Sequence, residues 1–329
     1  MKSLITGIAG QTGSYLAEHL LFHGHKVFGM IRRNSVAEHQ ESRIQHLSKD
    51  IETFYGDVTD ISSISKIMRQ VKPDHIYNLA AQSHVRISFD TPIYTVNTNA
   101  MGVLNMLECA KEIVPNAKFL QASSSEMFGL SVDPDGFQRE STPMNPVSPY
   151  GVAKLFAYNM TRHYRRAYGM FIVNSICFNH ESPRRSSNFV TTKIIDGFLR
   201  IKYGMADHIE LGNIESSRDW GFAGDYVRAM YLAMCQPEPS DYVISTQNTH
   251  TVRHFCEQVS QKILNKSADQ FIRINKKYFR KEELPFLMGD SSKIRALGWS
   301  PDYSFDDLLN MMITEISAHF IIRHNILQK

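Results

Sequence analysis

Four side chains near the middle of the chain have the types and spacing needed for acid–base chemistry. Ser124 and Glu126 follow a predicted strand, and Tyr150 and Lys154 are four residues apart in a predicted helix at 150–168. This spacing puts the tyrosine and the lysine on one helical face, so we expect the ammonium to lower the pKa of the phenol and help it act as a base. Such a pair is common on amphipathic helices, so its surroundings decide whether it is a site.

Glu126 is the member of this group that a plain alcohol oxidation does not require. Once a sugar hydroxyl is oxidised to a ketone, the neighbouring C–H becomes acidic. A carboxylate beside it can remove that proton and assist the loss of an adjacent hydroxyl. The residues therefore suggest a dehydratase. The alternative is a structural carboxylate that caps a turn, and the residues alone leave both interpretations open.

A glycine-rich loop at the start of the chain predicts a nucleotide site. Gly7, Gly10 and Gly13 have a G-x-x-G-x-x-G spacing between a predicted strand at 2–6 and a predicted helix at 14–22. Glycine allows a tight turn and a close approach of the backbone to a pyrophosphate, while the helix N-terminus directs N–H groups at the anion. Glycines alone can form an ordinary turn, but a strand before them and a helix after them favour a dinucleotide.

The residues after the second predicted strand, at 26–31, indicate which dinucleotide binds. Arg32 and Arg33 stand where an NAD-preferring protein usually has an acid for the ribose 2′-hydroxyl. Guanidinium groups instead suit a 2′-phosphate, because arginine makes charge-assisted bonds to phosphate oxygens. The pattern predicts NADP as the cofactor, and the alternative is a pair of solvated surface arginines.

The elements expected to position these residues alternate between strands and helices. Strands are predicted at 2–6, 26–31, 51–55, 74–79, 117–122 and 171–177, and helices at 14–22, 96–110 and 150–168. This βαβ pattern predicts an α/β protein with a Rossmann-like, doubly wound parallel sheet. We assign residues 1–180 to an NADP-binding domain.

The alternation becomes looser after residue 180. A helix is predicted at 224–235, a strand at 241–245, a helix at 251–264 and a last helix from 304. Ligands of open α/β sheets lie beyond the carboxyl ends of the strands. We therefore expect residues 181–329 to form mainly a smaller α/β substrate-binding lobe, with some later segments returning to the first domain.

Composition excludes several classes of protein. The 36 Lys and Arg residues nearly balance the 33 Asp and Glu residues, which argues against nucleic-acid binding by bulk charge. The four cysteines include no C-x-x-C pair, so neither a zinc cluster nor a disulfide framework is predicted. No apolar run approaches the length of a membrane span. We expect a cytoplasmic protein that binds no membrane.

Three further runs make the chain resemble a known family. They are IYNLAAQSHV at 76–85, FNHESPRR at 178–185, and LGN at 211–213 leading to RDWG at 218–221. With the glycine loop and the Tyr/Lys pair, the chain resembles the GDP-mannose 4,6-dehydratase family of extended short-chain dehydrogenase/reductases over nearly its whole length. The resemblance implies a lyase that converts GDP-D-mannose to GDP-4-keto-6-deoxy-D-mannose and water. Hydride would pass through tightly bound NADP, in the biosynthesis of GDP-deoxyhexoses such as GDP-fucose or GDP-rhamnose.

The resemblance also implies a role for each site residue. Ser124 takes the place of the family's catalytic threonine, Glu126 is the general base, and Tyr150 is the hydroxyl base that Lys154 supports. The implied cofactor contacts are Gly7, Ile8, Ala9, Gly10, Gln11, Thr12, Gly13, Arg32, Arg33, Asn34, Ser35, Asp57, Val58, Leu79, Ala80, Ala81, Gln82, Ser83, Tyr94, Tyr150, Lys154, His180 and Arg185. The implied nucleotide-sugar contacts are Ser83, Ser124, Glu126, Tyr150, Asn179, Lys193, Arg218, Arg253 and Glu283.

Further expectations concern departures from the family's sequence pattern, the oligomeric state and alternative functions. Thr12 stands where the family usually has Asp, and Ser124 keeps the hydroxyl of threonine with more rotamer freedom. Family members form dimers or tetramers, so the resemblance implies a homo-oligomer. No metal is predicted, because the histidines have no ligand spacing. Two alternatives stay open: a reductase of the 4-keto-6-deoxy sugar, alone or combined with the dehydratase, and a non-catalytic NADP-binding protein.

Overall fold

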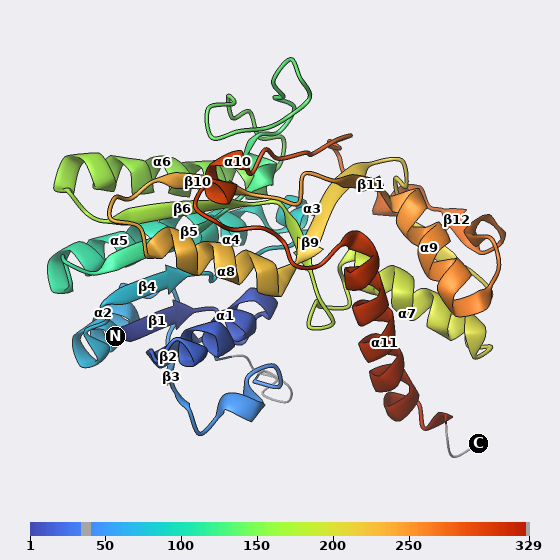
Figure 1. The fold of residues 1–329 in the computed structure, drawn as a ribbon, viewed down its shortest axis with the longest axis horizontal. Coiled ribbons are helices and arrows are strands. Elements are labelled where there is room, and N and C mark those ends of the chain that lie inside the picture. Colours follow the sequence, from blue (N-terminus) through green and yellow to red (C-terminus); the bar gives the residue numbers. More distant parts are fainter. Residues whose placement is uncertain (34–40, 327–329) are drawn as a thin grey trace.

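A seven-stranded parallel sheet forms the centre of the molecule (Figure 1). The computed structural model describes residues 1–33 and 41–326. The strand order is β10-β6-β5-β4-β1-β2-β3, and every neighbouring pair is parallel. The strands are β1 (Lys2–Thr6), β2 (Lys26–Ile31), β3 (Ile51–Tyr55), β4 (His75–Asn78), β5 (Lys118–Ser124), β6 (Ile172–Cys177) and β10 (Asp241–Ile244). The predicted doubly wound parallel sheet is confirmed.

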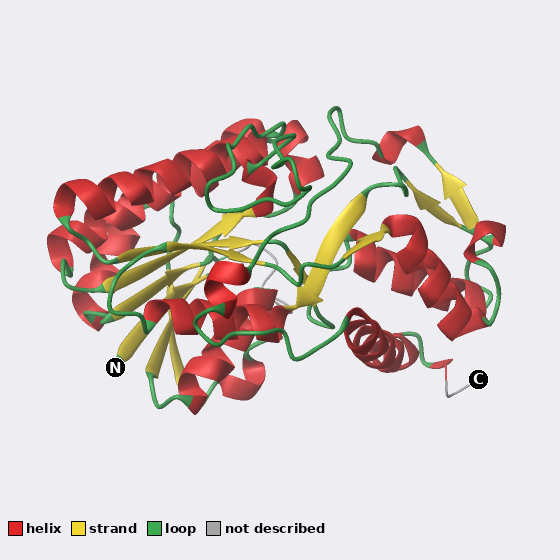
Figure 2. Ribbon diagram, turned by 45° about the horizontal axis from the view of Figure 1, so that its top comes forward, coloured by secondary structure: helices red, strands yellow, loops and turns green. Residues whose placement is uncertain are grey.

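Helices cover both faces of this sheet (Figure 2). On one face α1 (Gln11–Phe22) packs against α8 (Ala223–Met234), and on the other α5 (Gly102–Ile113) packs between α2 (Ile61–Val71) and α6 (Pro149–Tyr168). Each face has its own apolar core. Because both faces are covered, the central strands are largely buried, and every residue of β6 is buried, including the polar Asn174 and Ser175.

A third apolar core lies in the smaller lobe, which is at the right of Figure 1. It lies among α7 (Val190–Lys202), α9 (Val252–Leu264) and α11 (Phe305–Arg323). The small strands are β7 (Asn179–Glu181), β8 (Ile209–Leu211), β9 (Ser217–Phe222), β11 (Thr249–Thr251) and β12 (Ile272–Ile274). The later segments α8 and β10 belong to the layers of the main sheet, so the chain passes between the lobes more than once. Among the described helices, none is long and apolar enough to cross a membrane.

The helix predicted at 96–110 is interrupted in the structure. The chain forms α3 (Val85–Asp90), α4 (Pro92–Val96), a π-helical turn at Asn97–Met101 and then α5. Inside the π-helical turn, the Asn99 amide donates to the carbonyl oxygen of Gln82 and accepts from its N–H, both at 2.8 Å. The wider turn therefore ties the helix to the loop that follows β4, and such π-turns are frequent at functional sites.

Candidate active site

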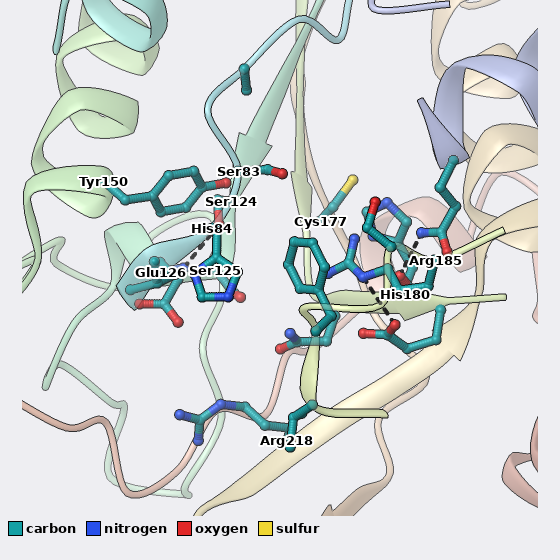
Figure 3. Close-up of a pocket in the computed structure, with 18 of the residues that line it drawn as sticks. Ser83, His84, Ser124, Ser125, Glu126, Tyr150, Cys177, His180, Arg185 and Arg218 are labelled. Carbon is teal, nitrogen blue, oxygen red and sulfur yellow. Dashed lines mark hydrogen bonds and ion pairs between the residues drawn. The ribbon is translucent and has the colours of Figure 1, made fainter. Parts of the chain in front are cut away.

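A cleft of about 810 Å³ lies at the carboxyl ends of the central strands, between the main sheet and the smaller lobe (Figure 3). Most of the residues that the sequence singled out meet there. Those that line it are Gly7, Gly10, Gln11, Thr12, Gly13, Leu79, Ala80, Ala81, Ser83, Ser124, Glu126, Tyr150, Lys154, Asn179, His180, Arg185, Lys193, Arg218 and Glu283. Segments far apart in the sequence thus form one site.

The other predicted contacts lie away from the cleft lining. They are Ile8, Ala9, Arg32, Arg33, Asp57, Val58, Gln82, Tyr94 and Arg253, while Asn34 and Ser35 lie outside the described residues. Arg253 forms ion pairs with Glu215 and Asp269, both at 2.7 Å, on the exposed surface of the smaller lobe. Arg32 is exposed and donates a hydrogen bond to the hydroxyl of Tyr94.

The glycine loop leaves no room for larger side chains. Gly7 has a φ of +69°, which favours glycine. A Cβ on Gly13 would lie 2.3 Å from the carbonyl oxygen of Gly7 and 2.7 Å from Cα of Ile8. Gly10 is the N-cap of α1 and provides no side-chain cap, so N–H groups of the first turn have no side-chain acceptor there. This cradle fits a pyrophosphate at a helix N-terminus.

Gln11 and Thr12 of the glycine loop form hydrogen bonds to residues in and just after β7. The imidazole of His180 donates from Nδ1 to the carbonyl oxygen of Phe178 (3.0 Å) and accepts at Nε2 from the hydroxyl of Thr12 (2.8 Å). Burial lowers the pKa of His180 to about 4, so the ring is neutral. The Gln11 amide donates to the backbone oxygen of His180 and accepts from Ser182. Both ring nitrogens are engaged, which gives His180 a positioning role.

The start of helix α6 is fixed by local capping, and this places Tyr150 in the first turn of the helix. The Ser148 hydroxyl caps the helix by accepting from the N–H of Gly151 at 3.0 Å, and Pro149 occupies the first turn. A Cβ on Gly151 would lie 2.7 Å from the carbonyl oxygen of Glu126. The end of β5 and the start of α6 are therefore in close contact, which brings Ser124 and Glu126 next to Tyr150, as Figure 3 shows.

The electrostatics of the Tyr/Lys pair differ from the expectation. Burial raises the pKa of Tyr150 to about 12, and a hydrogen bond with Ser124 opposes that shift. The Lys154 ammonium donates to the carbonyl oxygen of Ala122 at 2.8 Å and lies 5.8 Å from the centre of the Tyr150 ring. Burial lowers the pKa of this ammonium to about 8. The prediction of a lowered phenol pKa is wrong for the chain by itself, because burial outweighs the lowering effects of the Ser124 hydrogen bond and the Arg185 charge, and Lys154 is not among the groups that lower this pKa.

Glu126 is buried at the base of the cleft and faces cations from the smaller lobe. Its Oε1 atom lies 3.4 Å from Nη1 of Arg280. Arg218 donates to the carbonyl oxygen of Leu284, and burial lowers the pKa of its guanidinium to about 10. In Figure 3, Arg218 extends along the side of the cleft on which Glu126 lies.

Lys193 adds a third positive charge to this wall. Its ammonium donates to the carbonyl oxygen of Glu210 at 2.7 Å and lies 3.6 Å from the centre of the Tyr278 ring. Burial lowers its pKa. Buried cations without full pairing favour an anionic ligand, and guanidinium groups match phosphate oxygens well. The wall suits a diphosphate.

Arg43, His84 and Arg280 are among the lining residues that had no assigned role in the sequence analysis. Arg43 donates to the carbonyl oxygen of Arg184 at 2.7 Å, beside the glycine loop. His84 accepts from the N–H of Ile87 and donates to the carbonyl oxygen of Asn188, so it is neutral with both nitrogens engaged. Arg280 pairs with Glu126. Arg43 and Arg280 carry charge but lie in no motif that distinguishes them from surface arginines.

The family model and the similar proteins described below all indicate one family. The family model described as GDP-mannose 4,6 dehydratase matches residues 4–312. The chain is 46% identical over 326 residues to GDP-mannose 4,6 dehydratase 2 of Arabidopsis thaliana, covering 95% of this chain and 86% of that protein. It is 42% identical over 338 residues to the Homo sapiens GDP-mannose 4,6 dehydratase, covering 94% and 90%.

Solved structures with the same fold include two enzymes that act on other sugar nucleotides. The UDP-glucose 4-epimerase of Thermus thermophilus, in complex with NAD, has a TM-score of 0.83 and 24% identity, covering 96% of this chain and 99% of that one. The dTDP-glucose 4,6-dehydratase of Bacillus anthracis has a TM-score of 0.82 and 21% identity, covering 97% of each. These likenesses establish the fold.

Proposed function

Because the chain belongs to the GDP-mannose 4,6-dehydratase family, we propose that it converts GDP-D-mannose to GDP-4-keto-6-deoxy-D-mannose and water, with tightly bound NADP. One observation supports this beyond family membership. The buried carboxylate of Glu126 lies beside Tyr150 and Ser124 in the same cleft. Oxidation of a hydroxyl alone needs no second acid–base group, whereas removal of water does.

Each site residue has a defined part in this reaction. Tyr150 takes the proton of the C4 hydroxyl, and Ser124 orients that hydroxyl. Lys154, whose pKa is about 8, is mostly protonated at neutral pH and provides the positive charge that favours the phenolate. A bound nicotinamide cofactor would supply hydride transfer, taking hydride from C4 and returning it to C6, and the proton held by Tyr150 would then pass to C5. Glu126 removes the proton at C5 and assists the departure of the C6 hydroxyl as water.

The cofactor fits the loop before α1 and the end of β2. The cradle at Gly7 and Gly13 and the uncapped start of α1 would hold the pyrophosphate. Arg32 and Arg33, which are exposed just after β2, would hold a 2′-phosphate. We propose NADP rather than NAD because this strand end offers two guanidinium groups and no carboxylate.

The assembly and setting are further parts of the proposal. We propose a homo-oligomer, a dimer or tetramer, in the cytoplasm, with a role in forming GDP-deoxyhexoses such as GDP-fucose. Ile93, Met101, Val152 and Phe156 are exposed apolar side chains on the segments from α4 to α6. A second copy would cover such a face. Light scattering after size-exclusion chromatography tests the assembly, and a stable monomer would contradict it.

Mass spectrometry of GDP-D-mannose incubated with the purified enzyme and catalytic NADP tests the reaction. We expect the loss of one water with no consumption of added NADPH, since hydride returns to the substrate. Glu126→Gln should lower kcat by about 10²–10⁴-fold while cofactor binding is retained. A gain of two hydrogens in excess NADPH would reveal a reductase, and unchanged GDP-D-mannose would contradict the proposal.

A further inference from the structure

An ion pair joins the two sides of the cleft at the proposed base. Glu126 lies just after β5, and Arg280 lies 154 residues further along the chain, in the loop after the short turn at Lys276–Tyr278. The Oε1 to Nη1 distance is 3.4 Å, and the two side chains are 10% and 25% exposed. A carboxylate that faces a guanidinium is less available to a C–H bond, because the cation occupies the position from which a substrate would approach that oxygen.

This contact is longer than most arginine–carboxylate contacts among the described residues, although Arg162–Asp241 and Arg273–Asp207 are longer still, at 3.5 and 3.8 Å. Charge-assisted N–H···O bonds are normally about 2.7–2.9 Å long. Arg139, for example, bonds to Asp135 at 2.6 Å and to Asp290 at 2.8 Å. The Arg280 guanidinium is therefore held weakly enough by Glu126 to change partners.

The surroundings of Arg280 favour such an exchange. The backbone N–H of Arg280 donates to Oε1 of Glu283 at 2.9 Å, so the loop remains anchored when the guanidinium moves. Arg218 and Lys193 line the same wall, where we expect the diphosphate. A diphosphate carries more charge than one carboxylate and offers oxygens that match a guanidinium fork.

We propose that Arg280 restrains Glu126 in the substrate-free enzyme and passes to the diphosphate of the incoming nucleotide sugar, which frees the carboxylate to act as a base. This inference rests on the proposed function, in which Glu126 removes the C5 proton. The C5–H electron pair then forms the enolate of the C4 ketone, and the proton remains on Glu126. In D2O the carboxylic acid exchanges its proton for a deuteron and can return that deuteron to C5.

The test separates the nucleotide from the sugar. Free 4-keto-6-deoxy-D-mannose has no diphosphate, and its exchange of C5–H in D2O can be followed by proton NMR with the cofactor-loaded enzyme. In the wild type, added GDP should accelerate exchange about tenfold or more. In Arg280→Gln, exchange without GDP should already exceed that of the wild type, and GDP should change it less than about twofold. Exchange in Glu126→Gln gives the background rate.

A matched control removes another positive charge from the same lobe. Arg273 is exposed and pairs with Asp207 at 3.8 Å, outside the cleft lining. Arg273→Gln should respond to GDP as the wild type does. A change in its response would show that net charge, rather than the restraint on Glu126, sets the effect.

Three results would overturn the inference. They are no acceleration by GDP in the wild type, equal acceleration in Arg280→Gln, and slow exchange in that variant without GDP. If the variant does not fold, a crystal structure of the wild type with GDP decides: Arg280 must contact phosphate and leave Glu126, and an intact ion pair refutes the proposal. Water loss from GDP-D-mannose, measured separately, shows whether the proposed function holds.

Discussion

A buried polar network under the active site fixes the helix that carries Tyr150. Asp241, the first residue of β10, accepts hydrogen bonds from Arg165 and from Asn174 through one oxygen and from the hydroxyl of Tyr158 through the other. Tyr158 and Arg165 lie on α6, two and four turns beyond Tyr150. We predict that Asp241→Ala and Asp241→Asn destabilise the protein by different amounts.

The size of each effect follows from what the substitution leaves behind. Removing one member of a buried ion pair costs about 3–5 kcal/mol. Arg165 keeps its bond to the carbonyl oxygen of Ile172 at 2.8 Å and is 18% exposed, so we expect about 3 kcal/mol for Asp241→Ala. Asparagine keeps an acceptor for Arg165, and the Tyr158 hydroxyl can turn to accept from its amide. Asp241→Asn then loses mainly the charge, at about 1–2 kcal/mol.

Urea unfolding followed by circular dichroism measures these free energies of unfolding. All variants are compared at one protein concentration, because the stability of an oligomer depends on concentration. Asp196→Ala is the control, because Asp196 pairs with Arg200 on the surface of α7 and its loss should change stability by no more than about 0.5 kcal/mol. If Asp241→Ala also changes the free energy of unfolding by no more than about 0.5 kcal/mol, the network does not hold α6, and the reasoning fails.

Three further predictions concern pH, the glycine loop and the cofactor. Burial lowers the pKa of His75 from 6.5 to about 4, so the unfolded chain binds the proton first. The neutral His75 imidazole contributes fully to the free energy of unfolding above pH 6.5. This contribution decreases by up to about 1.4 kcal/mol per pH unit as the pH falls towards 4. Urea titrations at pH 7 and pH 5 should show a decrease in stability to which His19 and His180, whose pKa values are also lowered to about 4, contribute as well, so His75→Asn should reduce the slope without removing it. Gly13→Ala should destabilise by about 1–3 kcal/mol and reduce cofactor retention, because its Cβ meets the backbone of Gly7; wild-type cofactor content and urea midpoint would contradict this. Arg32→Ala with Arg33→Ala should weaken NADP binding by about 10–100-fold and leave NAD binding unchanged, which fluorescence titration measures; an equal loss for both dinucleotides would exclude a 2′-phosphate contact.

Much of the sheet could be predicted from sequence because its strands are marked by strong local patterns. A nearly continuous apolar run, interrupted by Asn174 and Ser175, marked β6, and the glycines marked the turn into α1. Both signals are local, because they depend on burial and on backbone geometry within a few residues. Helix α2 was not predicted, although its apolar residues Ile64, Ile67, Met68 and Val71 have helical spacing. Helix α7 was missed where the strand–helix alternation becomes looser.

The electrostatics of the site were harder to predict than its residues. The spacing of Tyr150 and Lys154 placed them on one helical face, but spacing contains no information on burial. The structure buries both groups, which raises the pKa of the phenol and lowers that of the ammonium. Likewise, Arg280 lies 154 residues from Glu126, and only the tertiary fold brings them together.

The two lobes depend on each other for chemistry as well as for packing. The helix that carries Tyr150 is held by Asp241 within the main sheet, whereas the carboxylate of Glu126 is paired with Arg280 of the smaller lobe, so one half of the acid–base machinery relies on that lobe. The glycine loop lies well before the residues of that lobe in the sequence, because a phosphate loop can be built from one βαβ unit. Movement of the smaller lobe would therefore change the ion pairing of Glu126, and not only the access of substrate to this carboxylate.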